Sequence, residues 1–136
     1  MKKIQRAVFD TSAMFAAVVR NDAHHVPARE TFARTTECLL PTTVVTELAY
    51  LFWKHGISAD VLEAVLNNPK TKIICDETAQ KKAISEVGER GISLLRINDI
   101  ATIQTAKAIN VPLVSFDRQL REEAKKKGIT VYPVEP

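Results

Sequence analysis

The stretch that decides the fold is RAVFDTSAMFAAVV, residues 6–19, in which one acidic side chain separates two apolar runs. Residues 6–9 predict a short buried strand, and residues 12–19 predict a mostly buried helix. Asp10 lies between them. Burying an unpaired carboxylate costs several kcal/mol or forces it to take up a proton. Asp10 must therefore either cap the helix or face something positive.

The composition is that of one ordinary soluble domain. The chain has 136 residues, 46% of them hydrophobic and 26% charged, which is enough for a single core. Its apolar windows fall short of the ~20 residues that span a bilayer, and Asp10 interrupts the N-terminal run that imitates a signal peptide. We expect one domain over residues 1–136, no membrane segment and a cytoplasmic location. A net charge of +3 favours anionic partners only mildly.

The two cysteines, Cys38 and Cys75, are far apart and belong to no C-x-x-C motif or Cys/His cluster. Each lies in a short apolar run, where a free thiol behaves as a small core residue. We expect both to be reduced and buried.

Short apolar runs alternate with helical patterns along the whole chain. Strands are expected at residues 6–9, 37–40, 72–75, 111–116 and 130–134. Helices are expected at residues 12–19, 25–33, 41–54, 58–66, 76–89, 98–109 and 117–128. Apolar strands separated by helices predict a parallel sheet covered on both faces, with right-handed crossovers. The expected fold is a three-layer α/β/α sandwich, Rossmann-like, with a five-stranded, mainly parallel sheet and residues 6–9 at its centre.

Four acidic residues stand out against this fold. Ligand sites in such sheets lie beyond the carboxyl ends of the strands, where Asp10 and Asp117 follow the first and fourth strands. Asp99 opens a helix, and Glu47 lies on the narrow polar strip of an otherwise apolar helix. Each aspartate taken alone could be a helix cap, and Glu47 an exposed carboxylate. Two acids at one sheet edge, each flanked by hydroxyls, favour a shared site.

Two other candidates are weaker. His24 and His25 are adjacent in a loop before a helix, where histidines are usually solvated rather than metal-bound. Asp76 follows the third strand as a phospho-acceptor would, but the fifth strand lacks the lysine that such a domain needs. We expect Asp76 to cap the helix that follows it.

Four segments resemble the motifs of the PIN-domain nucleases. They are DTSAMFA at residues 10–16, VVTELAY at 44–50, INDIATIQTAKA at 97–108 and VPLVSFDRQL at 111–120. They occur in order over essentially the whole chain, and the length is most similar to that of VapC-type toxins of toxin–antitoxin pairs. The resemblance implies a PIN-like fold with Asp10, Glu47, Asp99 and Asp117 as the catalytic acids.

The resemblance also assigns supporting residues. Ser12 and Ser115 match the small hydroxyl positions beside the first and fourth acids. Several carboxylates within a few ångströms cannot all ionise unaided, and a hard cation such as Mg²⁺ or Mn²⁺ resolves that conflict. Asp10, Asp99 and Asp117 are the expected metal ligands. Glu47 would complete the site directly or through a water that it orients.

The function implied is a metal-dependent ribonuclease, with RNA as substrate, a homodimeric state and a cognate antitoxin protein as partner. Because an acidic cleft repels phosphate, basic residues at its rim, with Arg118 and Arg121 as candidates, would have to attract the RNA. The aromatic residues Tyr50 and Trp53 are better explained by core or dimer packing than by base stacking. The alternative is a non-catalytic α/β module that binds a protein or RNA partner, with the acids serving as helix caps.

Overall fold

The computed structural model describes residues 2–135, and within them one five-stranded sheet forms. Its strands are β1 (Ile4–Phe9), β2 (Thr35–Pro41), β3 (Thr71–Ile74), β4 (Leu113–Val114) and β5 (Val131–Tyr132). They lie in the order β3-β2-β1-β4-β5, and every neighbouring pair is parallel. The expected parallel α/β fold with a central first strand is confirmed.

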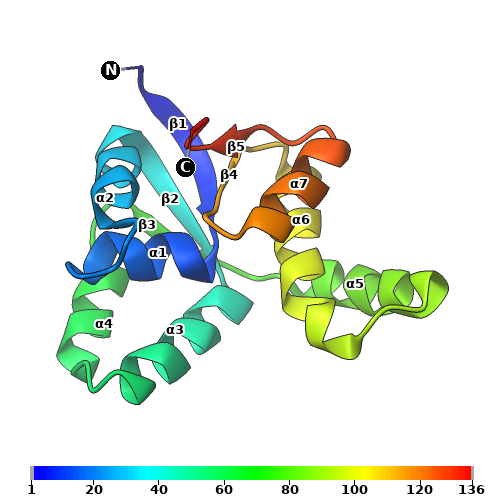
Figure 1. Cartoon of the computed structure of the whole chain (residues 1–136), viewed down its shortest axis with the longest axis horizontal. Helices are drawn as coiled ribbons and strands as arrows, with labels where there is room; N and C mark the ends of the chain where they lie inside the picture. The colour runs from blue at the N-terminus through cyan, green and yellow to red at the C-terminus, as the bar shows by residue number, and fades with distance from the viewer. Residues whose placement is uncertain (1, 136) are drawn as a thin grey trace.

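Helices cover both faces of the sheet. They are α1 (Thr11–Val18), α2 (His25–Arg34), α3 (Thr42–Lys54), α4 (Ala59–Leu66), α5 (Glu77–Arg90), α6 (Ile97–Ile109) and α7 (Arg118–Lys126), with a short 3-10 turn, η1 (Leu94–Arg96). Figure 1 shows α1, α2 and α4 on one side of the sheet, α6 and α7 on the other, and α5 beside α6. No helix within residues 2–135 is long and apolar enough to cross a bilayer.

The central strand is buried on both faces, which explains its continuous apolar run. Successive side chains point to opposite faces of a sheet. Phe9 accordingly packs in one cluster with Ala13 of α1, whereas Val8 packs in another with Ile103 of α6 and Leu120 of α7. The cluster around Phe9 fixes α1 directly behind the end of β1, where Asp10 lies.

The last two strands are shorter than expected. β4 and β5 each contain two residues rather than the runs 111–116 and 130–134. Pro112 immediately precedes β4 and Pro133 immediately follows β5, and a proline has no N–H to donate to a ladder. β4 therefore starts later than expected, and β5 ends earlier.

The two cysteines differ in environment. Both are free, Cys38 is buried in β2, and Cys75 is exposed, so the expectation that Cys75 is buried is wrong. Cys75 follows β3, the strand at the edge of the sheet, and Ile73 in that strand is also half exposed. An apolar run on an edge strand is covered less completely than one in the centre.

Asp76 caps a helix, but not the helix expected. Its side chain makes no capping bond to α5. Instead its carboxylate accepts hydrogen bonds from the hydroxyls of Thr42 and Thr43 and, at 3.3 Å, from the backbone N–H of Thr43. These residues begin α3, whose own N-cap position is Pro41, with no side-chain acceptor. The end of β3 thus supplies the acceptor that the start of α3 lacks.

Candidate active site at the carboxyl edge of the sheet

The four predicted acids line one cavity at the carboxyl edge of the sheet. Asp10 follows β1, Asp117 follows β4 before α7, Glu47 comes from α3 and Asp99 from the first turn of α6. The rest of the lining consists of Thr11, Ser12, Leu51, Thr102 and Leu120. The topology brings together four residues that are spread over more than a hundred positions, because β1 and β4 are adjacent and end at the same edge.

Asp10 is buried, with 5% of its surface exposed. Its Oδ1 accepts hydrogen bonds from the Ser12 hydroxyl at 2.7 Å and from the Ala13 N–H at 2.8 Å, and its Oδ2 accepts one from the Ser115 hydroxyl. Burial raises the pKa of Asp10 to about 6 against the opposing effect of these hydrogen bonds, and the charge of Asp117 adds to the rise. Asp10 is therefore a helix cap and a buried site carboxylate at once.

The two serines predicted to support the site tie the ends of β1 and β4 together. Besides donating to Asp10, the Ser12 hydroxyl accepts from the Phe116 N–H at 3.1 Å. The Ser115 hydroxyl accepts from the Asp117 N–H, also at 3.1 Å. This network sets the position of Asp117 relative to Asp10.

Asp117 and Glu47 line the same cavity and are more open to solvent than Asp10. Asp117 caps α7, its Oδ1 accepting from the Leu120 N–H at 2.9 Å, and it is exposed. Glu47 is partly buried, and its Oε1 accepts from the Thr11 hydroxyl at 2.7 Å. Thr11 follows Asp10, so its hydroxyl links α3 to the strand end that carries the most buried acid.

Asp99 shows that the acids act on one another electrostatically. Burial raises the pKa of Asp99, the charges of Asp117 and Glu47 raise it further, and the Arg96 guanidinium opposes the rise. The Arg96 Nε lies 3.5 Å from the Asp99 Oδ2. Like charges in one cavity disfavour the ionised forms, as expected where a cation is needed.

The donor chemistry fits a hard divalent cation, because all four acids present oxygen and two of them are pushed toward neutrality without one. The coordination geometry is not formed: no three His, Cys, Asp or Glu side chains within residues 2–135 are close enough to hold one ion. Three of the acids instead contact protein groups. Asp10 accepts hydrogen bonds from Ser12 and Ser115, Glu47 accepts one from Thr11, and Asp99 pairs with Arg96. Binding a metal requires these side chains to rearrange.

The two arginines expected at the rim have different positions. Arg118, directly after Asp117, has a side chain that is 94% exposed and lies 3.6 Å from Glu122. The expectation for Arg121 is wrong, because this residue is 4% exposed. Its guanidinium donates to the carbonyl oxygens of Ser115, Tyr132, Pro133 and Val134. These carbonyls lie at or just past the ends of the two short strands, so Arg121 holds the C-terminal segment to the end of β4.

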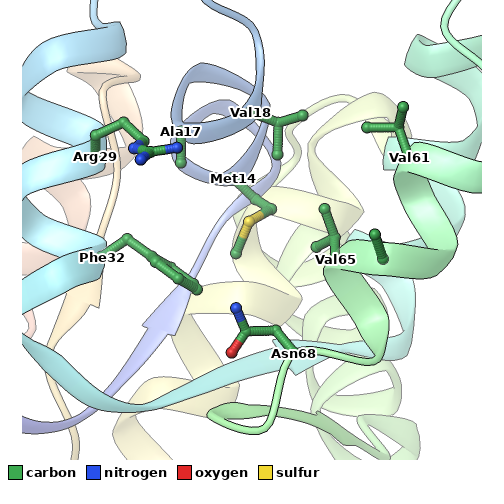
Figure 2. Close-up of a pocket in the computed structure, with 9 residues that line it drawn as sticks. Met14, Ala17, Val18, Arg29, Phe32, Val61, Val65 and Asn68 are labelled. Atoms are coloured by element: carbon green, nitrogen blue, oxygen red, sulfur yellow. The ribbon is translucent and has the colours of Figure 1, made fainter.

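Arg96 contacts Asp99 but is not identified from the sequence, and Thr11, expected only as a hydroxyl beside Asp10, donates to Glu47 instead. Arg96 had a detectable signal, since residues three apart on a helix are neighbours and Arg96 precedes Asp99 by three. A separate apolar pocket, also missed, lies between α1, α2 and α4 and is lined in part by Met14, Phe32 and Val65 (Figure 2). None of the four acids lines it.

The fold and the cavity define a class of protein, a parallel α/β domain with an acidic site at the carboxyl edge of its sheet. The family model of the PIN domain matches residues 7–126, so the chain belongs to the PIN-domain family. A comparison with curated proteins finds no match.

Solved structures share this fold. The crystal structure of VapC20 of Mycobacterium tuberculosis, titled a sarcin–ricin-loop-cleaving toxin, matches 86% of this chain and 94% of its own at a TM-score of 0.72 and 16% identity. VapBC2 from Rickettsia felis, bound to a DNA fragment from its promoter, covers 93% of this chain and 97% of its own, with a TM-score of 0.63 and 17% identity. PAE2754 from Pyrobaculum aerophilum covers 93% of this chain and 89% of its own, with a TM-score of 0.62 and 21% identity. At such identities the likeness establishes the fold.

Proposed function

We propose that this protein is a metal-dependent endoribonuclease and the toxin of a toxin–antitoxin pair. The observation that carries the proposal is the convergence of Asp10, Glu47, Asp99 and Asp117 on one cavity at the edge of a PIN-family sheet. The structural likeness to VapC20, a sarcin–ricin-loop-cleaving toxin, supports RNA as the substrate class.

Asp10, Asp99 and Asp117 are the proposed ligands of Mg²⁺ or Mn²⁺. When bound, such a cation lowers the pKa of water and offsets negative charge at the phosphodiester. The serines hold the buried Asp10 carboxylate in one orientation in the metal-free protein. Glu47, which accepts a hydrogen bond from Thr11, completes the anionic site directly or by orienting a water.

Basic residues at the rim of the cavity would have to attract the RNA. The acids repel phosphate, whereas Arg118 places an exposed guanidinium one residue from Asp117. We propose Arg118 as an RNA contact, and Arg121 is not proposed because its guanidinium is engaged with backbone carbonyls.

A homodimer and an antitoxin partner complete the proposal. Tyr50 and Trp53 on α3 are 59% and 76% exposed, and Leu95 is 92% exposed, which favours burial against another protein chain. Exposure also rules out the core as the place of the two aromatic side chains. The likeness to VapBC2 supports a cognate antitoxin as one partner.

The second candidate function is a non-catalytic binding module, favoured by the observation that Asp10 and Asp117 do cap α1 and α7. Thermal melting with and without Mn²⁺, beside an RNA cleavage assay in EDTA and in added metal, separates the two. The nuclease hypothesis requires stabilisation by Mn²⁺, its loss in Asp10→Asn, and cleavage that EDTA abolishes. The absence of both cleavage and any metal effect would favour the module, whereas cleavage that persists unchanged in EDTA would overturn the metal dependence.

A further inference from the structure

Arg96 lies between two acids that belong to different parts of the molecule. It ends η1, immediately before α6, and its side chain is 19% exposed. Its Nε is 3.5 Å from the Asp99 Oδ2, and its Nη2 is 2.8 Å from the Glu123 Oε1 on α7. One guanidinium thus joins a proposed metal ligand to a carboxylate outside the cavity.

The Glu123 side of this arrangement is firmly anchored. Glu123 is 15% exposed and also lies 3.8 Å from Arg90, which pairs with Glu86. The Glu86 Oε1 in turn lies 2.7 Å from the Lys127 Nζ. Charges alternate along this network, and a partly buried guanidinium in such a network is costly to remove from its partners. Arg96 is therefore a fixed positive charge at the wall of the acidic cavity.

The Asp99 side is looser. At 3.5 Å the Arg96 Nε and the Asp99 Oδ2 form an ion pair rather than a hydrogen bond. The Arg96 Nε is buried and has no hydrogen-bond partner among the residues described. The Asp99 side chain is 39% exposed. Asp99 can therefore leave Arg96 without breaking a hydrogen bond, while Arg96 stays with Glu123.

We propose that Arg96 is a built-in counter-ion of Asp99, which holds this carboxylate in the metal-free protein and competes with the divalent cation for it. The proposal rests on the proposed function, since it assigns Asp99 to a metal. It accounts for the geometry of the cavity, in which four acids face one space and yet no three of them converge in the part of the chain that the structure describes.

Two opposite effects follow from the charge of Arg96. Without metal, Arg96 offsets the repulsion that Asp117 and Glu47 exert on Asp99, so it stabilises the fold. With metal, it is a like charge beside a dication and lowers the affinity of the site. Arg96 is thus a positioning residue that sets the metal concentration at which the site fills.

The test compares Arg96→Gln and Arg96→Lys with a matched control, Arg90→Gln. Arg90 belongs to the same network but pairs with Glu86 and Glu123 rather than with Asp99. Mn²⁺ affinity is measured on the full chain by titration calorimetry, and melting temperature is measured in EDTA and in Mn²⁺.

Arg96→Gln is expected to lower the Kd for Mn²⁺ about tenfold and to lower the melting temperature in EDTA, a loss that Mn²⁺ reverses. Arg96→Lys keeps the charge and should stay close to the wild-type Kd. Arg90→Gln should lower the melting temperature and leave the Kd unchanged.

Equal or weaker Mn²⁺ binding by folded Arg96→Gln would overturn the proposal, and so would an equal gain in Arg90→Gln. A wild-type chain that binds no Mn²⁺ would instead refute the proposed function itself. Should Arg96→Gln fail to fold, NMR of the wild-type arginine Nε–H groups decides. Saturating Mg²⁺ should shift the Arg96 signal and not that of Arg6, which pairs with Glu37. An unchanged Arg96 signal while Mg²⁺ binds would refute the proposal that Arg96 is the counter-ion of Asp99.

Discussion

Asp76 at the carboxyl end of β3 and Thr43 in the first turn of α3 are joined by two hydrogen bonds, from the backbone N–H and from the hydroxyl of Thr43. Thr43 lies one turn before Glu47 on the same helix, and Glu47 contacts Thr11 beside Asp10. The end of an edge strand therefore fixes the helix that forms one wall of the acidic cavity.

The Asp76 contact predicts a loss of stability and of activity together. Asp76→Ala removes the cap of α3 and leaves buried donors unsatisfied, which should lower the free energy of unfolding by about 2 kcal/mol. Cleavage should fall because Glu47 loses its fixed position. Denaturant unfolding and an RNA cleavage assay measure the two effects. Thr42→Ser, which keeps one donating hydroxyl, is the control, and an unchanged unfolding free energy in Asp76→Ala would show that α3 needs no external cap.

Asp10→Asn distinguishes a metal ligand from a mere cap. Asparagine keeps the shape and most of the capping ability, but it removes a charge that is buried and repelled by Asp117. The variant should therefore melt in EDTA at or above the wild-type temperature, gain nothing from Mn²⁺, and be inactive on RNA. Lower melting in EDTA combined with retained cleavage would identify Asp10 as a structural cap alone.

The remaining acids predict a common loss of activity on an intact fold. Glu47→Gln, Asp99→Asn and Asp117→Asn should each lower the cleavage rate about 100-fold or more, as expected when charged groups at a reacting centre are neutralised. Asp60→Asn, an exposed position in α4, should leave the rate unchanged. Circular dichroism checks that the variants fold. Near-wild-type rates for all three would place the chemistry elsewhere.

The two arginines of α7 predict opposite phenotypes. Arg118→Gln, with the four acids left in place, should bind a non-cleaved RNA more weakly than the wild type. The slope of log K against log salt concentration should fall by about one, and the melting temperature should not change. Arg121→Gln removes a buried donor to the carbonyls of Ser115 and Pro133 and should lower stability by about 2–3 kcal/mol. Fluorescence anisotropy at several salt concentrations and thermal melting separate them, and a purely RNA-binding defect in Arg121→Gln would contradict the structure.

The sequence predicts those features that follow from local pattern plus one topological rule. The apolar run before Asp10 indicates a doubly covered strand, and the acids after the first and fourth strands must share an edge once those strands are parallel neighbours. The four acids are found around one cavity for this reason. Their roles as ligands remain a prediction, because residue type and proximity do not reveal how each carboxylate turns when a cation binds.

Features that depend on distant partners were not predictable in this way. Asp76 caps α3 because β3 ends beside it, a relation between segments more than thirty residues apart in the chain. Arg121 is buried although arginine is mostly exposed, since the carbonyls of Ser115 and Pro133, just past two short strands, accept from its guanidinium. Cys75 is exposed because its strand lies at the sheet edge, a position that its own apolar neighbours do not reveal.

The ion network behind the site predicts how stability depends on pH. Burial alone would raise the pKa of Glu86, but hydrogen bonds from Lys127, Arg90 and Gln104 outweigh it and lower the pKa from 4.5 to about 2. The folded protein then binds fewer protons than the unfolded chain between these values. The contribution of Glu86 is therefore fully present above about pH 4.5 and is lost as the pH falls toward about 2.

Glu86→Gln tests this dependence. At pH 7 the variant should be less stable than the wild type by about 2–3 kcal/mol, from the size of the pKa change. Near pH 2.5 the difference should shrink to about 0.8 kcal/mol. Urea unfolding between pH 2 and 7 measures the two curves, with Glu77→Gln as the control, since its pair with Lys81 is exposed and worth little. The same deficit at pH 2.5 and at pH 7 would mean that Glu86 acts through packing rather than through its charge.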